Sequence, residues 1–160
     1  MSKSVLMISA ALLLAAGASG AASAQVKRVG APTATISSVV SVPPGYGLVY
    51  VAGMTAGGMG SPIPEGMDTK AQTIIILDKL KAALAGEGLS FSDVTMMNVY
   101  LVADAAKEGK MDSPGMNEAF KQYFGTAEQP NKPARVTVQV AALGSPRTLV
   151  EISLQAARKP

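Results

Sequence analysis

The segment Ala134–Val140 alternates strictly between apolar and polar side chains, and this period of two restricts it to a β-strand with two unlike faces. One face consists of Val136, Val138 and Val140, and the other of Arg135, Thr137 and Gln139. Residues 149–156 alternate in the same way after the turn at 143–146, with Glu151 and Ser153 on the polar side. We expect packing to bury the valines and to leave both polar sides on the opposite face of a sheet.

Two longer segments repeat apolar residues with the 3.6-residue period of amphipathic helices. In Thr69–Gly86 the first residue and Gln72 have the spacing of a capping box. In Ser113–Phe124 the first residue is placed to cap the helix, and Pro114 suits its first turn. We expect both helices to pack their apolar stripes against the valine-bearing face of the sheet.

Apolar and β-branched runs predict three further strands, at residues 36–42, 48–55 and 94–102. Turn residues join the first two into a hairpin, and apolar side chains on both faces place 48–55 in the centre of the sheet. The resulting order ββαβαββ is an α/β (α+β) fold, a mixed sheet with two helices on one face. Residues 36–160 then form a single domain, whose uncovered, semi-polar sheet face favours self-association.

Residues 1–24 have the features of a secretory signal peptide, namely Lys3, an apolar run and the small residues Ala22-Ser23-Ala24. The apolar run is too short to cross a bilayer, which takes about 20 residues. We expect cleavage after Ala24 and export, to the periplasm. We also expect a flexible lead-in at 25–35 and no membrane association of the cleaved chain.

The sequence contains no cysteine and no histidine, which excludes cysteine nucleophiles, serine-histidine triads and the common zinc-ligand sets. We therefore expect no metal site, and stability from packing or assembly instead of disulfides. Of the 14 basic residues, Lys3, Lys27, Arg28, Arg158 and Lys159 lie near the chain ends, which leaves nine in the domain beside 11 acidic residues. This balance argues against a nucleic-acid partner.

Arg135 and Glu151 come within reach of each other if the last two strands are antiparallel neighbours. Their spacing is compatible with a purely structural ion pair between strands. It is also compatible with a site in which the planar guanidinium of Arg135 binds an anion while Glu151 positions a water molecule. The residues alone leave both interpretations open.

The sequence Asn-Lys-Pro-Ala-Arg-Val-Thr-Val-Gln-Val-Ala-Ala-Leu at 131–143, followed by Leu-Val-Glu-Ile-Ser-Leu at 149–154, resembles the carboxy-terminal signature of the RidA/YjgF family of imine deaminases. The resemblance covers most of 36–157 and includes Leu-Val-Tyr-Val-Ala-Gly at 48–53 and the segment 117–120. It implies a chorismate-mutase-like fold that assembles as a homotrimer with clefts between the subunits.

The same resemblance implies hydrolysis of reactive 2-imino or 2-enamino acids to 2-oxo acids and ammonia, without any cofactor. By this resemblance Arg135 holds the substrate carboxylate, Glu151 orients the attacking water and Thr137 contributes backbone groups to the catalytic site. Ser38 and Asn117 take substrate-binding positions. The expected partners are a small carboxylate-bearing ligand and further copies of the chain.

The cleft positions depart from the family pattern in several places. Ile36-Ser37-Ser38-Val39 stands where the family has Gly-Pro-Tyr, Ala52-Gly53-Met54 replaces Ser-Gly-Gln, and the connection 144–148 is longer. An altered cleft is compatible with a non-catalytic trimer that binds small carboxylates. A ribonuclease, the label long attached to relatives, and a holdase chaperone with a methionine-rich surface are the remaining alternatives.

Overall fold

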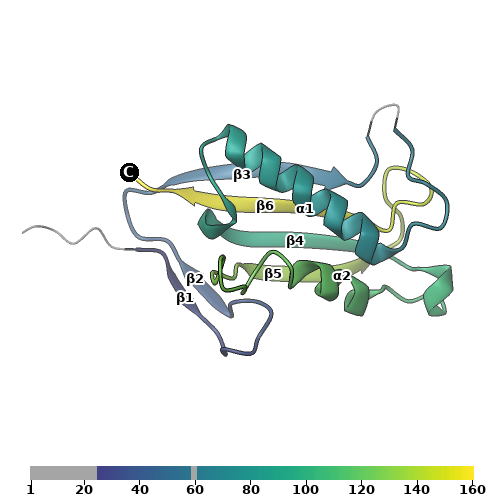
Figure 1. Cartoon of the computed structure of the whole chain (residues 1–160), viewed down its shortest axis with the longest axis horizontal. Helices are drawn as coiled ribbons and strands as arrows, with labels where there is room; N and C mark the ends of the chain where they lie inside the picture. Colours follow the sequence, from purple (N-terminus) through teal and green to yellow (C-terminus); the bar gives the residue numbers. More distant parts are fainter. Residues whose placement is uncertain (1–24, 59–60) are drawn as a thin grey trace, which may run out of the picture.

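The computed structural model describes residues 25–58 and 61–160, and its centre is a four-stranded sheet with the order β3-β6-β4-β5. These strands are β3 (Gly47–Thr55), β4 (Val94–Val102), β5 (Ala134–Val140) and β6 (Val150–Arg158). β6 runs antiparallel to β3 and β4, whereas β4 and β5 are parallel. α1 (Thr69–Gly86) and α2 (Ser113–Phe120) cover one face of this mixed sheet (Figure 1), which confirms the expected fold class.

Each helix is capped by the aspartate that precedes the residue expected to cap it. Asp68, not Thr69, accepts a 2.7 Å hydrogen bond from the backbone N–H three residues on. Asp112, not Ser113, does the same for α2 at 3.0 Å. A carboxylate is a strong acceptor whose negative charge is favourable at a helix N-terminus, so the aspartate and not the neighbouring hydroxyl forms the cap hydrogen bond. α2 ends at Phe120, four residues before the expected end.

The hydrophobic core lies between the sheet and the two helices. Its buried members include Ile76, Leu77, Leu80 and Leu84 of α1, Met116 and Phe120 of α2, Met97, Val99 and Leu101 of β4, and Ile152 and Leu154 of β6. Burial of an aliphatic or aromatic side chain of this size stabilises a fold by about 1.5–3 kcal/mol. Both helices are therefore held firmly on one face, and the opposite face stays uncovered in a single chain.

A separate antiparallel ribbon, β1 (Lys27–Val29) with β2 (Val39–Ser41), precedes the sheet (Figure 1). Arg28 fastens it to the start of β4, because its guanidinium donates to the carbonyl oxygens of Ser92 and Val94 at 2.8 and 3.0 Å. The segment expected to be a flexible lead-in thus contains a strand with a tertiary anchor.

The expected hairpin between 36–42 and 48–55 is wrong, because β2 pairs with β1 while β3 pairs with β6. β3 is also an edge strand of the single chain and not its central strand. The last two strands are not neighbours either, since β4 lies between them. A strand that follows a helical crossover pairs in parallel with the strand before that helix, which places β5 beside β4.

The two faces of β5 are the reverse of those expected from its alternation. Arg135 and Thr137 stand beside Met97 and Val99 of β4, which are fully buried under the helices. The valines of β5 lie on the uncovered face, where Val136 is 46% exposed. Period-two alternation defines two faces but does not say which is covered, and a long arginine side chain fits under a helix at a sheet edge.

Among the described residues, no helix combines the length and the apolar character needed to cross a membrane. The predicted signal peptide, residues 1–24, lies outside the described residues.

Candidate functional site

Arg135 is a half-buried cation at the sheet edge, beside α2. Its guanidinium carbon lies 4.5 Å from the centroid of the Phe120 ring, and its Nη1 is 3.5 Å from the sulfur of Met116. No carboxylate among the described residues lies within ion-pairing distance of it. Burial lowers the pKa of the Arg135 guanidinium to about 10, because loss of hydration disfavours the charged form. An anion bound next to the guanidinium would stabilise its charged form in place of the lost hydration.

Asn117 orients this guanidinium. Its Oδ1 accepts a 2.7 Å hydrogen bond from Nη2 of Arg135, and it comes from the same helix as the Met116 and Phe120 contacts. A planar guanidinium held by an acceptor on one side and an aromatic ring below keeps donors available for a carboxylate. The structure thus brings together two of the residues that the sequence selected, Arg135 and Asn117.

Thr137 lies two residues further along the same face of β5. Its hydroxyl oxygen is buried and has no hydrogen-bond partner. Such an unpaired hydroxyl in a native interior is costly, by roughly 1–3 kcal/mol, and calls for an explanation. Thr137 is therefore beside Arg135 as expected, but its side chain is enclosed in the single chain.

Ser38 is exposed, and its backbone N–H donates to the carbonyl of Val29 at 2.7 Å. Its neighbour Ser37 is buried and bonds to the residues just before Arg135: its N–H donates to the Pro133 carbonyl at 2.9 Å and its hydroxyl to the carbonyl of the preceding lysine at 2.7 Å. The segment that carries Ser38 is thus attached to the start of β5, without a direct contact between Ser38 and Arg135.

Glu151 lies on the uncovered face, where β6 pairs it with Tyr100 of β4 and Thr55 of β3. Gly53, at a bulge in β3, faces the carboxylate of Glu151 so closely that a Cβ atom there would lie 2.9 Å from its Cδ. Only a glycine leaves the carboxylate this position. The glycine of the 48–53 motif therefore has a local role, because it makes room for the glutamate side chain.

Arg135 and Glu151 are on opposite faces of the same sheet. Arg135 shares its face with Met97, which is in the core, whereas Glu151 shares its face with Tyr100 and Val138. The interpretation of the two as an ion pair within one chain is therefore wrong, as is the expectation that one polar face carries both. If they act on one molecule, they come from different copies of the chain.

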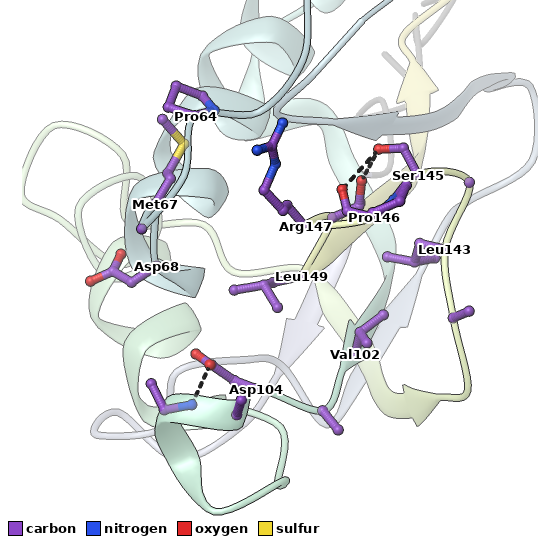
Figure 2. Close-up of a pocket in the computed structure, with 17 residues that line it drawn as sticks. Pro64, Met67, Asp68, Val102, Asp104, Leu143, Ser145, Pro146, Arg147 and Leu149 are labelled. Carbon is purple, nitrogen blue, oxygen red and sulfur yellow. Dashed lines mark hydrogen bonds between the residues drawn. The ribbon is translucent and has the colours of Figure 1, made fainter.

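Glu151 borders a cavity of about 720 Å³ between residues 55–58 and 61–63 on one side and the connection 144–148 on the other. A second cavity, of about 660 Å³, adjoins it on the other side of that connection (Figure 2). Thr55, Ser61, Ser145 and Thr148 bring hydroxyl groups to the first cavity, and Arg147 borders both. These cavities mark the half of the site that carries Glu151.

Two side chains of α1 hold the walls of this half-site, and no sequence pattern assigned either of them to a functional site. The side-chain amide of Gln72 is fully buried, donates to the carbonyls of Met67 and Arg147 at 3.0 and 2.9 Å, and accepts from the Leu149 N–H at 2.9 Å. The capping box expected for Gln72 is therefore wrong. Its side chain instead anchors the connection that leads into β6.

Lys79 anchors the opposite wall. Its ammonium donates to the carbonyls of Thr55, Ala56 and Gly57 at 3.0, 2.9 and 2.7 Å. Three acceptors around one ammonium satisfy all its donors, so the end of β3 is fixed to α1. A lysine off the apolar stripe of a helix usually lies in solvent, which is why only the tertiary structure reveals this contact.

The uncovered face of the sheet is apolar near both of its edges. Leu48 and Tyr50 of β3 are 56% and 68% exposed, and Val136 and Val138 of β5 are 46% and 40% exposed. Apolar side chains that cover a sheet face are characteristic of an interface. Met54, in contrast, packs against the core from the helix side, so it does not line this face.

Residues 27–158 match the model of a protein family described as Endoribonuclease L-PSP. The chain belongs to this family. A RutC family protein of Saccharolobus solfataricus is 34% identical over 108 residues, which cover 67% of this chain and 76% of that protein. A RutC family protein of Pyrococcus horikoshii is 40% identical over 76 residues, or 48% of this chain. The chain spans about half the length of the Pyrococcus relatives that it matches.

Solved structures place the chain among the Rid/YjgF proteins, as its sequence resemblance predicts. Escherichia coli TdcF, a structure with bound serine, has 29% identity and a TM-score of 0.59, over 74% of this chain and 85% of TdcF. The Rid family protein YyfB of Yersinia pestis shares the fold, with a TM-score of 0.65 and 23% identity over 82% of this chain and 97% of YyfB.

Proposed function

We propose that the chain is a RidA-like hydrolase of 2-imino or 2-enamino acids. The observation that carries this proposal is Arg135, a half-buried cation without a carboxylate partner among the described residues. A bound carboxylate supplies the missing charge and fixes the adjacent imine carbon. That carbon is already electrophilic, so the protein needs only to hold the substrate and to place a water.

The chemistry balances without a cofactor. A water molecule oriented by the Glu151 carboxylate attacks the imine carbon and forms a C–O bond. The nitrogen takes up the protons that the water loses, the C–N bond breaks, and ammonia leaves a 2-oxo acid. Glu151 has space for this role, because its side chain borders a cavity and has no ion-pair partner among the described residues.

The proposal requires that Arg135 of one copy and Glu151 of another meet at an interface. β5 and β3 are the two edges of the sheet, and Glu151 lies beside β3 while Arg135 lies on β5. A contact between unlike edges, repeated around an axis, closes into a ring. The apolar uncovered face supports such packing, and the family resemblance suggests three copies.

The test is the release of ammonia and 2-oxo acid from imines that an amino-acid oxidase generates in situ. We expect the wild-type chain to accelerate this release over the spontaneous rate, and Arg135→Ala to lose the acceleration. Arg158→Ala is the matched control, because Arg158 is exposed and paired with Glu87 at 2.8 Å. No acceleration by the wild type, or an undiminished rate in Arg135→Ala, overturns the proposal.

A second candidate is a trimer that binds small carboxylates without turnover. The serine found in TdcF supports a small polar ligand for a relative of this chain. The altered cleft residues support this candidate less than the sequence indicated, because one of them, Met54, packs against the core and not in a cleft. Calorimetric titration with 2-oxo acids separates the two candidates: binding that depends on Arg135, in the absence of any imine hydrolysis, favours the binder.

Export to the periplasm is a separate part of the proposal. It is supported by Lys3, the apolar run and Ala22-Ser23-Ala24 in the sequence. Amino-terminal sequencing of the chain purified from a periplasmic extract should begin at Gln25. A chain that keeps Met1 and stays in the cytoplasm would contradict it.

A further inference from the structure

We propose that Arg147 is a second anion-binding residue and that the preferred substrates are 2-imino acids with a second carboxylate in the side chain. This inference rests on the proposed function, since it names the substrate class of the same site. It follows from the backbone conformation, the charge and the position of Arg147, each of which is independent of the Arg135 site.

Arg147 occupies a backbone conformation that an arginine rarely adopts. Ser145 to Thr148 form a tight turn, closed by a 3.2 Å hydrogen bond from the Thr148 N–H to the Ser145 carbonyl. Pro146 holds the second position, and Arg147 in the third has φ of 70°. This is a type II turn, whose third position favours glycine. A side chain kept there against its backbone preference suggests a function for that side chain.

The rest of the turn is fixed, so the position of Arg147 is defined. Gln72 donates from the buried interior to the Arg147 carbonyl at 2.9 Å and accepts from the Leu149 N–H at 2.9 Å. The hydroxyls of Ser145 and Thr148 are 2.8 Å apart and close the turn on its other side. The guanidinium thus projects from an anchored base, as ligand-binding groups do.

The guanidinium of Arg147 forms no ion pair with any described residue. Figure 2 shows the side chain extending from the turn into the space between Pro64 and Ser145. Arg147 borders the cavity that holds Glu151, yet the two do not pair. An exposed arginine that leaves a nearby glutamate unpaired keeps both groups free for a ligand between them.

The three groups together define the substrate. The 2-carboxylate binds Arg135 of one copy, and the imine carbon faces the water on Glu151 of the other. A side chain that continues into the cavity of about 720 Å³ approaches Arg147, whose planar fork fits a carboxylate. A 2-imino acid derived from an acidic amino acid meets this arrangement, whereas an alkyl side chain leaves Arg147 without a partner.

The experiment compares two substrates of four carbons, 2-iminosuccinate and 2-iminobutyrate, each generated in situ by an oxidase from its amino acid. We expect the full chain to accelerate hydrolysis of 2-iminosuccinate about tenfold more than hydrolysis of 2-iminobutyrate. A factor of about this size is the effect of one charge-assisted hydrogen bond. Arg147→Gly should remove this preference, keep the rate with 2-iminobutyrate within about twofold, and raise the melting temperature because glycine suits the turn. Arg147→Lys should keep part of the preference.

Equal rates for the two imines in the wild type, or a preference that survives in Arg147→Gly, overturn the inference. An equal loss with both imines in Arg147→Gly also overturns it, because Arg147 then acts on Glu151 and not on the substrate. If no imine is hydrolysed, the proposed function fails, and calorimetry with succinate and butyrate then tests whether Arg147 binds a second carboxylate. Tighter binding of succinate that is lost in Arg147→Gly supports this role of Arg147, and equal binding of the two ligands overturns it.

Discussion

Arg135 and Glu151 lie on opposite faces of one sheet, with β4 between their strands. Neither side chain has an ion-pair partner among the described residues. In the proposed function a single chain therefore carries two half-sites, an anion-binding half under α2 and a carboxylate half beside β3. Activity of the proposed kind then requires assembly, which makes interface residues as important as the two charged groups.

Substitution on the uncovered face should separate the copies and abolish activity together. Val138 is 40% exposed in the single chain and stands on the face of Glu151. In an interface, Val138→Glu buries an unpaired charge, which costs several kcal/mol. Analytical ultracentrifugation should show monomers of Val138→Glu, with lost imine hydrolysis. Lys81→Glu, on the exposed side of α1, should leave both unchanged.

Asn117→Asp should weaken carboxylate binding more than Asn117→Ala does. The aspartate places a negative charge where an amide oxygen now accepts from Arg135 at 2.7 Å, so it pairs with the guanidinium and competes with the ligand. We expect at least a tenfold loss of affinity for 2-oxo acids in calorimetry, at unchanged or higher melting temperature. Equal affinities of the two variants would show that Arg135 is not the anion anchor.

Gly53→Ala should slow hydrolysis without unfolding the chain. The new Cβ displaces the Glu151 carboxylate, which is the mobile end of a side chain and moves at small cost to stability. Because misplacement of a reacting group by about 1 Å costs roughly 100-fold in rate, kcat should fall while KM changes little. Gly86→Ala is the matched control: nothing lies within 4 Å of its new Cβ, and activity should not change.

Thr137→Val should stabilise the free chain by about 1 kcal/mol, because it removes a buried hydroxyl that has no partner. Chemical denaturation measures this difference. If the hydroxyl acts only through the fold, imine hydrolysis is unchanged. A loss of stability instead would indicate that the hydroxyl finds a partner in the assembled protein.

Tyr123 should contribute a pH-dependent part of the stability. Burial, and then its 2.8 Å hydrogen bond to Asp78, raise the pKa of Tyr123 from 10.0 to about 12. The folded state favours the neutral phenol, so this contribution is fully present below pH 10 and is lost as the pH rises toward about 12. The difference in unfolding free energy between wild type and Tyr123→Phe should therefore shrink over that range, and a constant difference would contradict the prediction.

Most elements could be predicted from the sequence because their patterns are local. The bounds of α1, β4 and β5 are as the periodicity indicates, and the structure places Arg135 and Asn117, two residues that the family resemblance selected, in hydrogen-bond contact. The caps differ by one residue, since Asp68 competes with Thr69 for the same N–H groups and local spacing does not rank them. Gln72 and Lys79 were missed because their partners are distant loop carbonyls.

The sequence by itself determined both helices and the strands of the main sheet, which residues carry charge, and to which family the chain belongs. Hydrophobic period and motif spacing are properties of residues close together in the chain, so they can be recognised from the sequence alone. Only the tertiary structure decided which face of β5 the helices cover, that β4 separates β5 from β6, and that Arg135 and Glu151 point apart. These facts depend on strand order and on packing between distant segments, which alternation within one strand does not specify.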